Sequence, residues 1–128
     1  MNFRKIHHIA IVCSDYNRSK NFYVNKLGFE VMQEVYREER NSYKLDLALN
    51  GEYVIELFSF PAAPARPSYS EARGLRHLAF EVEDIEETVR LLKKEGIVTE
   101  EIRIDSYTHK RFTFFEDPDG LPLEIYED

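Results

Sequence analysis

Apolar and polar side chains alternate over residues 8–13, 45–49, 53–60, 77–82 and 123–126, and this period predicts β-strands with one buried face. The dipeptide Asn50-Gly51 joins two of these segments and predicts a two-residue hairpin between the alternating sets Leu45/Leu47/Leu49 and Tyr53/Ile55/Leu57. The sequence Asp117-Pro118-Asp119-Gly120 predicts a second turn near the C-terminus. Helical patterns follow Asp15 and Asp84, which are suited to cap a helix N-terminus, and they end at Gly28 and Gly96.

These landmarks form an internal repeat. His8, Ala10 and Asp15 recur as His77, Ala79 and Asp84 with the same spacing. Each half then continues with a helix-ending glycine, a turn glycine and a glutamate, Glu56 or Glu124, at matching offsets. Each half therefore predicts the order strand, helix and three strands.

The repeat predicts an α+β fold of two paired βαβββ modules that form a metal-binding cleft. We expect one domain over residues 1–128, with module one at 1–60, a linker at 61–75 and module two at 76–128. Prolines 61, 64 and 67 predict a polyproline II conformation for the first part of this linker.

Strand alternation predicts which face each unusual residue occupies. Aliphatic residues such as Ile11, Leu57 and Leu123 are expected to pack beneath the helices. The opposite face then carries two histidines and two glutamates, His8, Glu56, His77 and Glu124. His7 is expected to point toward the helix side.

Imidazole nitrogen and carboxylate oxygen are suitable ligands for Ni²⁺, Co²⁺, Zn²⁺ or Mn²⁺. A single histidine or glutamate on a strand is usually a structural or solvated residue. Four of them at repeat-equivalent positions on one face instead predict a site for one divalent metal ion.

The composition of the chain argues against several classes of binding partner and location. The chain has 24 acidic and 17 basic residues and a net charge of −7, which argues against nucleic acid or an anionic membrane surface. No apolar run approaches the ~20 residues of a membrane-spanning helix. The single cysteine, Cys13, cannot form a disulfide within the chain. We therefore expect a cytoplasmic protein.

The motifs resemble the vicinal oxygen chelate superfamily, in particular glyoxalase I-like proteins and the small bacterial YaeR-like group. The resemblance covers essentially the whole chain. It rests on these segments: His-Ile-Ala-Ile at 8–11, Asn-Arg-Ser-Lys-Asn-Phe-Tyr at 17–23, Val-Ile-Glu-Leu at 54–57, Arg-His-Leu-Ala-Phe at 76–80 and Asp-Pro-Asp-Gly-Leu-Pro-Leu-Glu at 117–124.

The resemblance implies paired βαβββ modules, a homodimer, a small-molecule substrate and one divalent metal ion per site. A histidine as first ligand resembles the nickel- or cobalt-activated glyoxalases, while zinc, manganese or iron are also compatible. The implied activity is that of a lyase or isomerase, in which the metal polarises substrate oxygens and a ligand carboxylate, Glu124 or Glu56, moves a proton. The implied substrate-binding residues are Phe58, Phe60, Arg73, Phe112 and Phe114.

Departures from the family pattern bear on the substrate. Glutathione-using members have an arginine four residues after the first ligand, where this chain has Val12, and polar residues in place of Phe58 and Phe60. Glutathione hemithioacetal is therefore expected to be at best a poor substrate. The main alternative is a protein resembling the bleomycin-resistance proteins, which bind a ligand without catalysis. Thiol transfer to fosfomycin is a further alternative, which uses three protein ligands.

Overall fold

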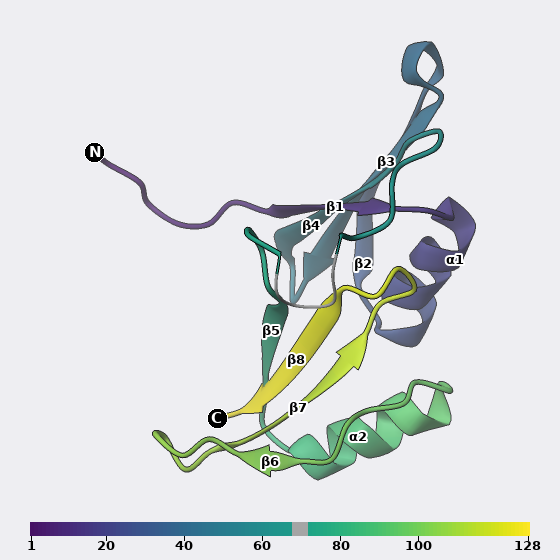
Figure 1. Cartoon of the computed structure of the whole chain (residues 1–128). Coiled ribbons are helices and arrows are strands. Elements are labelled where there is room, and N and C mark those ends of the chain that lie inside the picture. The colour runs from purple at the N-terminus through teal and green to yellow at the C-terminus, as the bar shows by residue number, and fades with distance from the viewer. Residues whose placement is uncertain (68–71) are drawn as a thin grey trace. The chain divides into compact units, whose positions relative to one another are not determined.

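The alternating segments of the sequence form the strands of two four-stranded sheets in the computed structural model, which describes residues 1–67 and 72–128 (Figure 1). The chain divides into two units, residues 1–65 and 66–128. This boundary falls inside the proline-rich segment. Ala62 has a φ of 55°, so a continuous polyproline II conformation over 61–67, as the sequence suggested, is wrong. The part of the expected linker at 68–71 lies outside the described residues.

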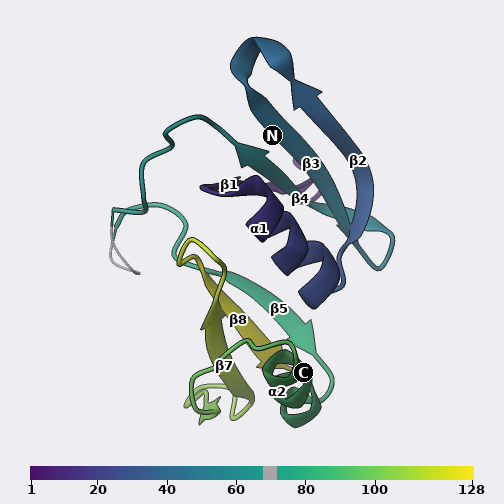
Figure 2. The same cartoon turned by 90° about the vertical axis from the view of Figure 1, so that its right-hand side faces the viewer.

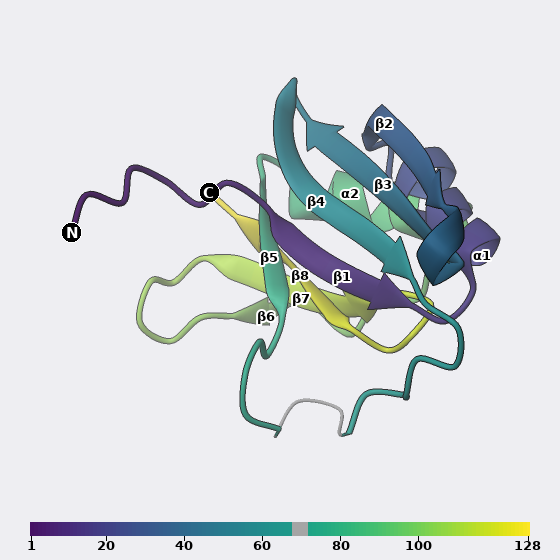
Figure 3. The same cartoon turned by 90° about the horizontal axis from the view of Figure 1, so that it is seen from above.

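The first unit is built as the repeat predicts, with one strand, one helix and three strands. Its elements are β1 (Ile9–Cys13), α1 (Tyr16–Lys20), β2 (Glu30–Arg37), β3 (Ser42–Leu49) and β4 (Glu52–Ser59). A π-helical segment over Asn21–Lys26 continues α1, and a 3₁₀ turn over Glu38–Arg40 joins β2 to β3. The strand order is β1-β4-β3-β2, with β1 parallel to β4 and the other pairs antiparallel (Figure 3).

One face of this sheet is covered by the helix (Figure 2). Phe22 and Tyr23 from the helical segment are buried, as are Leu45, Ile55 and Leu57 from the strands. Burial of these side chains removes apolar surface from water and is the main stabilising contribution to the unit. The aliphatic sets named by the alternation therefore do face the helix.

The second unit repeats the same order. Its elements are β5 (Leu78–Val82), α2 (Ile85–Lys94), β6 (Arg103–Ile104), β7 (Arg111–Glu116) and β8 (Pro122–Glu127). The strand order is β5-β8-β7-β6, again with the first and last strands parallel. β6 has only two residues, so this sheet is smaller than the first. Ile85, Leu92, Leu123 and Ile125 form its buried face.

Both predicted turns are present. Asn50 and Gly51 adopt φ values of 51° and 80°, the left-handed conformation that a tight hairpin requires at both central positions. In the second turn the Asp117 carboxylate accepts hydrogen bonds from the backbone N–H groups of Asp119 and Leu121. Among the helices of the described residues, none is long and apolar enough to cross a lipid bilayer.

We expect Asp84→Ala to lower the free energy of unfolding by about 1 kcal/mol, the usual effect of losing an N-cap. The Asp84 carboxylate accepts a hydrogen bond of 3.0 Å from the backbone N–H of Glu87 and so satisfies a free donor at the start of α2. Urea denaturation measures the change. The neighbouring exposed Glu83→Ala is the control and should stay close to wild type; equal losses in both variants would contradict the capping role.

Candidate metal centre

Strand pairing brings one histidine and one glutamate together in each unit. Ala10 lies opposite Glu56 in the β1–β4 pair, and Ala79 lies opposite Glu124 in the β5–β8 pair. His8 and His77 each precede their alanine by two residues, which places them on the glutamate's side of the sheet. The repeat seen in the sequence is thus a repeat in strand register.

The resulting contacts are close in both units. His8 Nε2 lies 3.7 Å from Glu56 Oε1, and His77 Nε2 lies 3.0 Å from Glu124 Oε2. The glutamate side chains are 16% and 13% exposed, whereas the histidines are 34% and 29% exposed. Each unit therefore presents a nitrogen and an oxygen donor that solvent can still reach.

Within residues 1–67 and 72–128, no three His, Cys, Asp or Glu side chains gather closely enough to hold a metal ion. The structure brings the four predicted ligands together as two pairs, one in each unit. Because a metal ion in a protein usually takes at least three protein donors, one pair alone is an incomplete ligand set.

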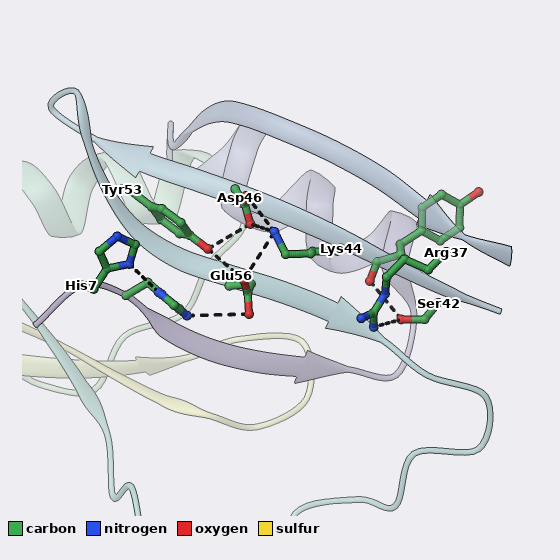
Figure 4. A network of polar contacts seen from close by, with 9 residues as sticks. His7, Arg37, Ser42, Lys44, Asp46, Tyr53 and Glu56 are labelled. Atoms are coloured by element: carbon green, nitrogen blue, oxygen red, sulfur yellow. Dashed lines mark hydrogen bonds and ion pairs between the residues drawn. The ribbon is translucent and has the colours of Figure 1, made fainter. Parts of the chain in front are cut away.

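A polar network surrounds the pair of the first unit (Figure 4). Lys44 Nζ donates to both carboxylate oxygens of Asp46, at 2.8 and 2.9 Å, and lies 3.4 Å from Glu56 Oε2. The Tyr53 hydroxyl lies 3.0 Å from Asp46 Oδ1 and 3.1 Å from Glu56 Oε2, and it can donate to either. The ring of Tyr53 stacks on His8 at 5.0 Å. Both members of the pair are thus held by neighbouring side chains.

Two pKa shifts follow from this network. The hydrogen bond to Asp46 raises the pKa of Lys44, so its ammonium stays charged beside the two carboxylates. Burial, with the neighbouring Asp46 and Glu56 carboxylates, raises the pKa of Tyr53 well above its usual value. Lys44 therefore supplies a positive charge and Tyr53 a neutral donor at neutral pH.

The position of Tyr53 differs from the sequence prediction. Simple alternation grouped Tyr53 with the buried Ile55 and Leu57, but the tyrosine ring contacts His8 and its hydroxyl contacts Glu56. The cause is a β-bulge: the pairs change from Ala48–Tyr53 to Leu47–Ile55, which leaves Val54 as an extra residue. The extra residue reverses the face on which Tyr53 lies.

His7 also departs from its prediction. Its ring contacts both His8, with the Nδ1 atoms 2.8 Å apart, and Tyr53, with the ring centroids 5.3 Å apart. It therefore does not point toward the helix. β1 begins at Ile9, so His7 lies two residues outside the strand, whereas His8 adjoins it and keeps its contact with Glu56.

The pair of the second unit has apolar surroundings. Phe114 lies opposite Glu124 in the β7–β8 register, where the first unit has Asp46 opposite Glu56. The ring of Phe114 meets His77 edge-on at 5.2 Å. Among the described residues, no hydrogen bond or ion pair reaches the Glu124 side chain apart from the contact with His77.

The predicted substrate-binding aromatics lie in pairs beside these centres. Phe58 and Phe60 stack at 5.6 Å in the first unit, and Phe112 and Phe114 meet edge-on at 6.1 Å in the second. All four are partly exposed. Arg73 is exposed in the segment before β5, and no ion pair joins it to the part of the chain that the structure describes.

Comparison with known proteins identifies the class. The Glyoxalase/Bleomycin resistance protein/Dioxygenase superfamily matches residues 5–125, and the chain belongs to this family. The resemblance found in the sequence is confirmed.

The individual relatives cover nearly the whole chain. YwkD of Bacillus subtilis strain 168 is 65% identical, covering 99% of each chain, and YaeR of Escherichia coli K12 is 61% identical, covering 99% of this chain and 98% of its own. A lactoylglutathione lyase of Salmonella typhimurium is 30% identical over 94% of this chain and 90% of its own. The crystal structure of a glyoxalase family protein from Enterococcus faecalis matches with a TM-score of 0.92 and 57% identity, covering 99% of this chain and all of that one.

Three residues around the first pair, Lys44, Asp46 and Tyr53, were missed by the sequence reasoning, as was Arg37, which packs on Phe58 and Phe60. Lys44 and Asp46 interrupt the apolar alternation of β3 on the face away from the helix, and this was the available signal. Their approach to Glu56 depends on the bulge at Val54, which alternation alone does not reveal.

Proposed function

We propose that the protein is a divalent-metal-dependent lyase or isomerase of the glyoxalase I type, with His8, Glu56, His77 and Glu124 as the ligands of one metal ion. The observation that supports it is the equivalence of the two histidine–glutamate pairs in strand register. Family membership supports it as well, because the family includes metal-dependent enzymes such as the related lactoylglutathione lyase. The two pairs, from one chain or from two copies, would make up the set of four donors.

The chemistry of these residues fits a metal ion. Two imidazoles and two carboxylates form a nitrogen–oxygen set of the kind that binds Ni²⁺, Co²⁺, Zn²⁺, Mn²⁺ or Fe²⁺, and nickel or cobalt is favoured by the family resemblance. The histidine rings remain partly exposed and can reach a ligand without unfolding of the sheet. Lys44 and Tyr53 fix one carboxylate before any ion arrives.

A metal ion bound there would polarise the oxygens of a substrate and increase the acidity of the adjacent carbon. We assign the proton transfer to Glu124. Among the described residues its carboxylate makes an ion pair with His77 and no other ion pair or hydrogen bond, so it has few polar partners to lose when it takes up or returns a proton. Glu56 is instead held by Tyr53 and Lys44 and would serve as a fixed ligand.

Removing a ligand should weaken metal binding. We expect His77→Ala to bind Ni²⁺ at least about 10-fold more weakly than wild type by calorimetry, and to lose the gain in melting temperature that added metal gives. His109→Asn is the matched control, because His109 lies in a turn outside the proposed ligand set at a φ of 61°, which asparagine tolerates. If His77→Ala and wild type bind nickel equally, the ligand assignment is wrong.

The second prediction concerns the substrate. With nickel-loaded protein we expect kcat/KM for the methylglyoxal–glutathione hemithioacetal to stay below about 10⁵ M⁻¹s⁻¹, because glutathione has two carboxylates that each need a partner, and Val12, Phe58 and Phe60 stand where the glutathione-using relatives have polar or charged groups. A panel of other 2-oxoaldehyde hemithioacetals and acyl-CoA epimers tests smaller or more apolar substrates.

On any panel member that reacts, Glu124→Gln should reduce kcat more than Glu56→Gln does at saturating metal. The reverse order would contradict the assignment of the base. Metal binding without turnover of any panel member would favour the alternative of a ligand-binding protein without catalysis. Efficient use of the glutathione adduct would make the protein an ordinary glyoxalase I.

We also propose that the protein is a homodimer. β2 forms an edge of its sheet, and the side chains of Val31 and Met32 on it are 45% and 54% exposed. In a single chain this edge would leave apolar surface and unpaired backbone groups in water. Sedimentation equilibrium should give about twice the chain mass of 15.2 kDa at micromolar concentration. A single species of 15.2 kDa over that range would exclude the dimer.

A further inference from the structure

Arg37, the last residue of β2, is held against two aromatic rings. Its guanidinium carbon lies 4.9 Å from the ring centroid of Phe58 and 5.6 Å from that of Phe60. One terminal nitrogen, Nη2, donates to Ser42 Oγ at 2.9 Å (Figure 4). Nε is buried, and none of the described residues accepts a hydrogen bond from it. The charged group is therefore fixed in place, and within residues 1–67 and 72–128 most of its five N–H donors have no hydrogen-bond acceptor.

A second arginine, in the other unit, provides a comparison, since it packs on two rings of β7, whereas the rings beside Arg37 lie on and just after β4. Arg103 lies over Phe112 and Phe114 at 4.9 and 5.7 Å, nearly the same distances as those of Arg37 from its rings. Arg103, however, is paired with Glu100 at 2.9 Å. Arg37 has no carboxylate within ion-pair distance among the described residues, although the chain has 24 acidic residues. A packed guanidinium without an acidic partner is suited to receive one from a ligand.

The position of Arg37 relates it to the candidate metal centre. Glu56 and Phe58 lie on the same face of β4, and Phe60 follows the last residue of the strand with its ring stacked on that of Phe58. At about 3.4 Å per extended residue, Phe58 lies about 7 Å from Glu56 along the strand, and Phe60, just past its end, lies up to about 14 Å away. Lys44, opposite Phe58, is the other basic residue here, but Asp46 and Glu56 already occupy its ammonium. In the part of the chain that the structure describes, Arg37 is thus the cation at this end of the face that has no carboxylate partner.

We propose that Arg37 binds the oxyanion of the substrate, a carboxylate or a phosphate, while Phe58 and Phe60 contact an apolar part of the same molecule. This rests on the proposed function, in which the oxygens at the other end of the substrate lie near Glu56. The substrate class is then an amphipathic acid, with its reacting oxygens about 7–14 Å from its anionic group. Such a spacing excludes methylglyoxal alone and requires a longer molecule.

The test measures binding separately from metal and turnover. The full chain, stripped of metal and dialysed free of chelator, is titrated with 4-phenylbutyrate, phenylphosphonate and the neutral 4-phenylbutyramide. We expect wild type to bind at least one of the two anions about 10-fold or more tightly than the amide, as a charge-assisted hydrogen bond to a guanidinium provides. Whether the carboxylate or the phosphonate binds more tightly tells which oxyanion the site takes.

Variants assign the effect to Arg37. Arg37→Gln should remove the preference for the anion, Arg37→Lys should retain part of it through its charge, and the matched Arg103→Gln should leave it at the wild-type value. The proposal is overturned if wild type binds neither anion, or binds anion and amide equally. It is also overturned if Arg37→Gln keeps the wild-type preference for the anion, or if Arg103→Gln loses that preference to the same extent. If Arg37→Gln does not fold, an Arg37→Lys variant with undiminished preference overturns it in its place.

Nickel calorimetry on Arg37→Gln keeps this proposal distinct from the proposed function. Unchanged metal affinity together with a lost anion preference supports both. A different result is that wild type shows no preference for the anion, while His77→Ala loses metal binding and Arg37→Gln keeps it. That result would contradict the anion site and support the metal ligands.

Discussion

The parallel pairing of the first and last strand in each unit is the constraint on which the candidate centre depends. Backbone hydrogen bonds fix Ala10 opposite Glu56 and Ala79 opposite Glu124. Because side chains alternate along a strand, a shift of one residue in either pair would turn the glutamate toward the helix and bury a charge in the apolar core. The cost of that burial holds the histidine and glutamate on the same face.

The two units share a backbone arrangement, but the side chains around Glu56 differ from those around Glu124. In the first unit Lys44, Asp46 and Tyr53 form a charged network around Glu56, whereas Phe112 and Phe114 occupy the corresponding strand beside Glu124. A carboxylate held by an ammonium and a hydroxyl group is fixed in place, whereas one beside phenyl rings has fewer polar partners to lose when it moves. This difference, and not the ligand residues themselves, distinguishes the roles we assign to the two glutamates.

Much of the fold could be predicted from the sequence because its signals are local. The Asn50-Gly51 turn, the Asp84 cap and the aliphatic alternation each act over a few residues, and each is present in the structure. The histidine and glutamate of each unit could be predicted to share a face because both halves of the chain have the same spacing, which indicates the same pairing of the first and last strands. Their union in one metal centre stays a prediction.

The residues that were missed depend on irregularities that leave no period in the sequence. Uninterrupted pairing from the Asn50-Gly51 turn would place Asp46 opposite Ile55, but the extra residue Val54 places it opposite Glu56. Tyr53 changes face for the same reason. The stacking of Arg37 on Phe58 and Phe60 joins separate strands, and alternation within one strand does not predict it.

The bulge has a consequence for how this chain can vary during evolution. Insertions and deletions are usually tolerated at hairpin tips, and the Asn50-Gly51 tip is exposed. Loss of the single residue Val54, however, would restore uninterrupted pairing and turn either Tyr53 or Glu56 to the opposite face. Relatives that keep this arrangement of side chains can therefore exchange residues along β4 but must conserve the number of residues between the turn and the glutamate.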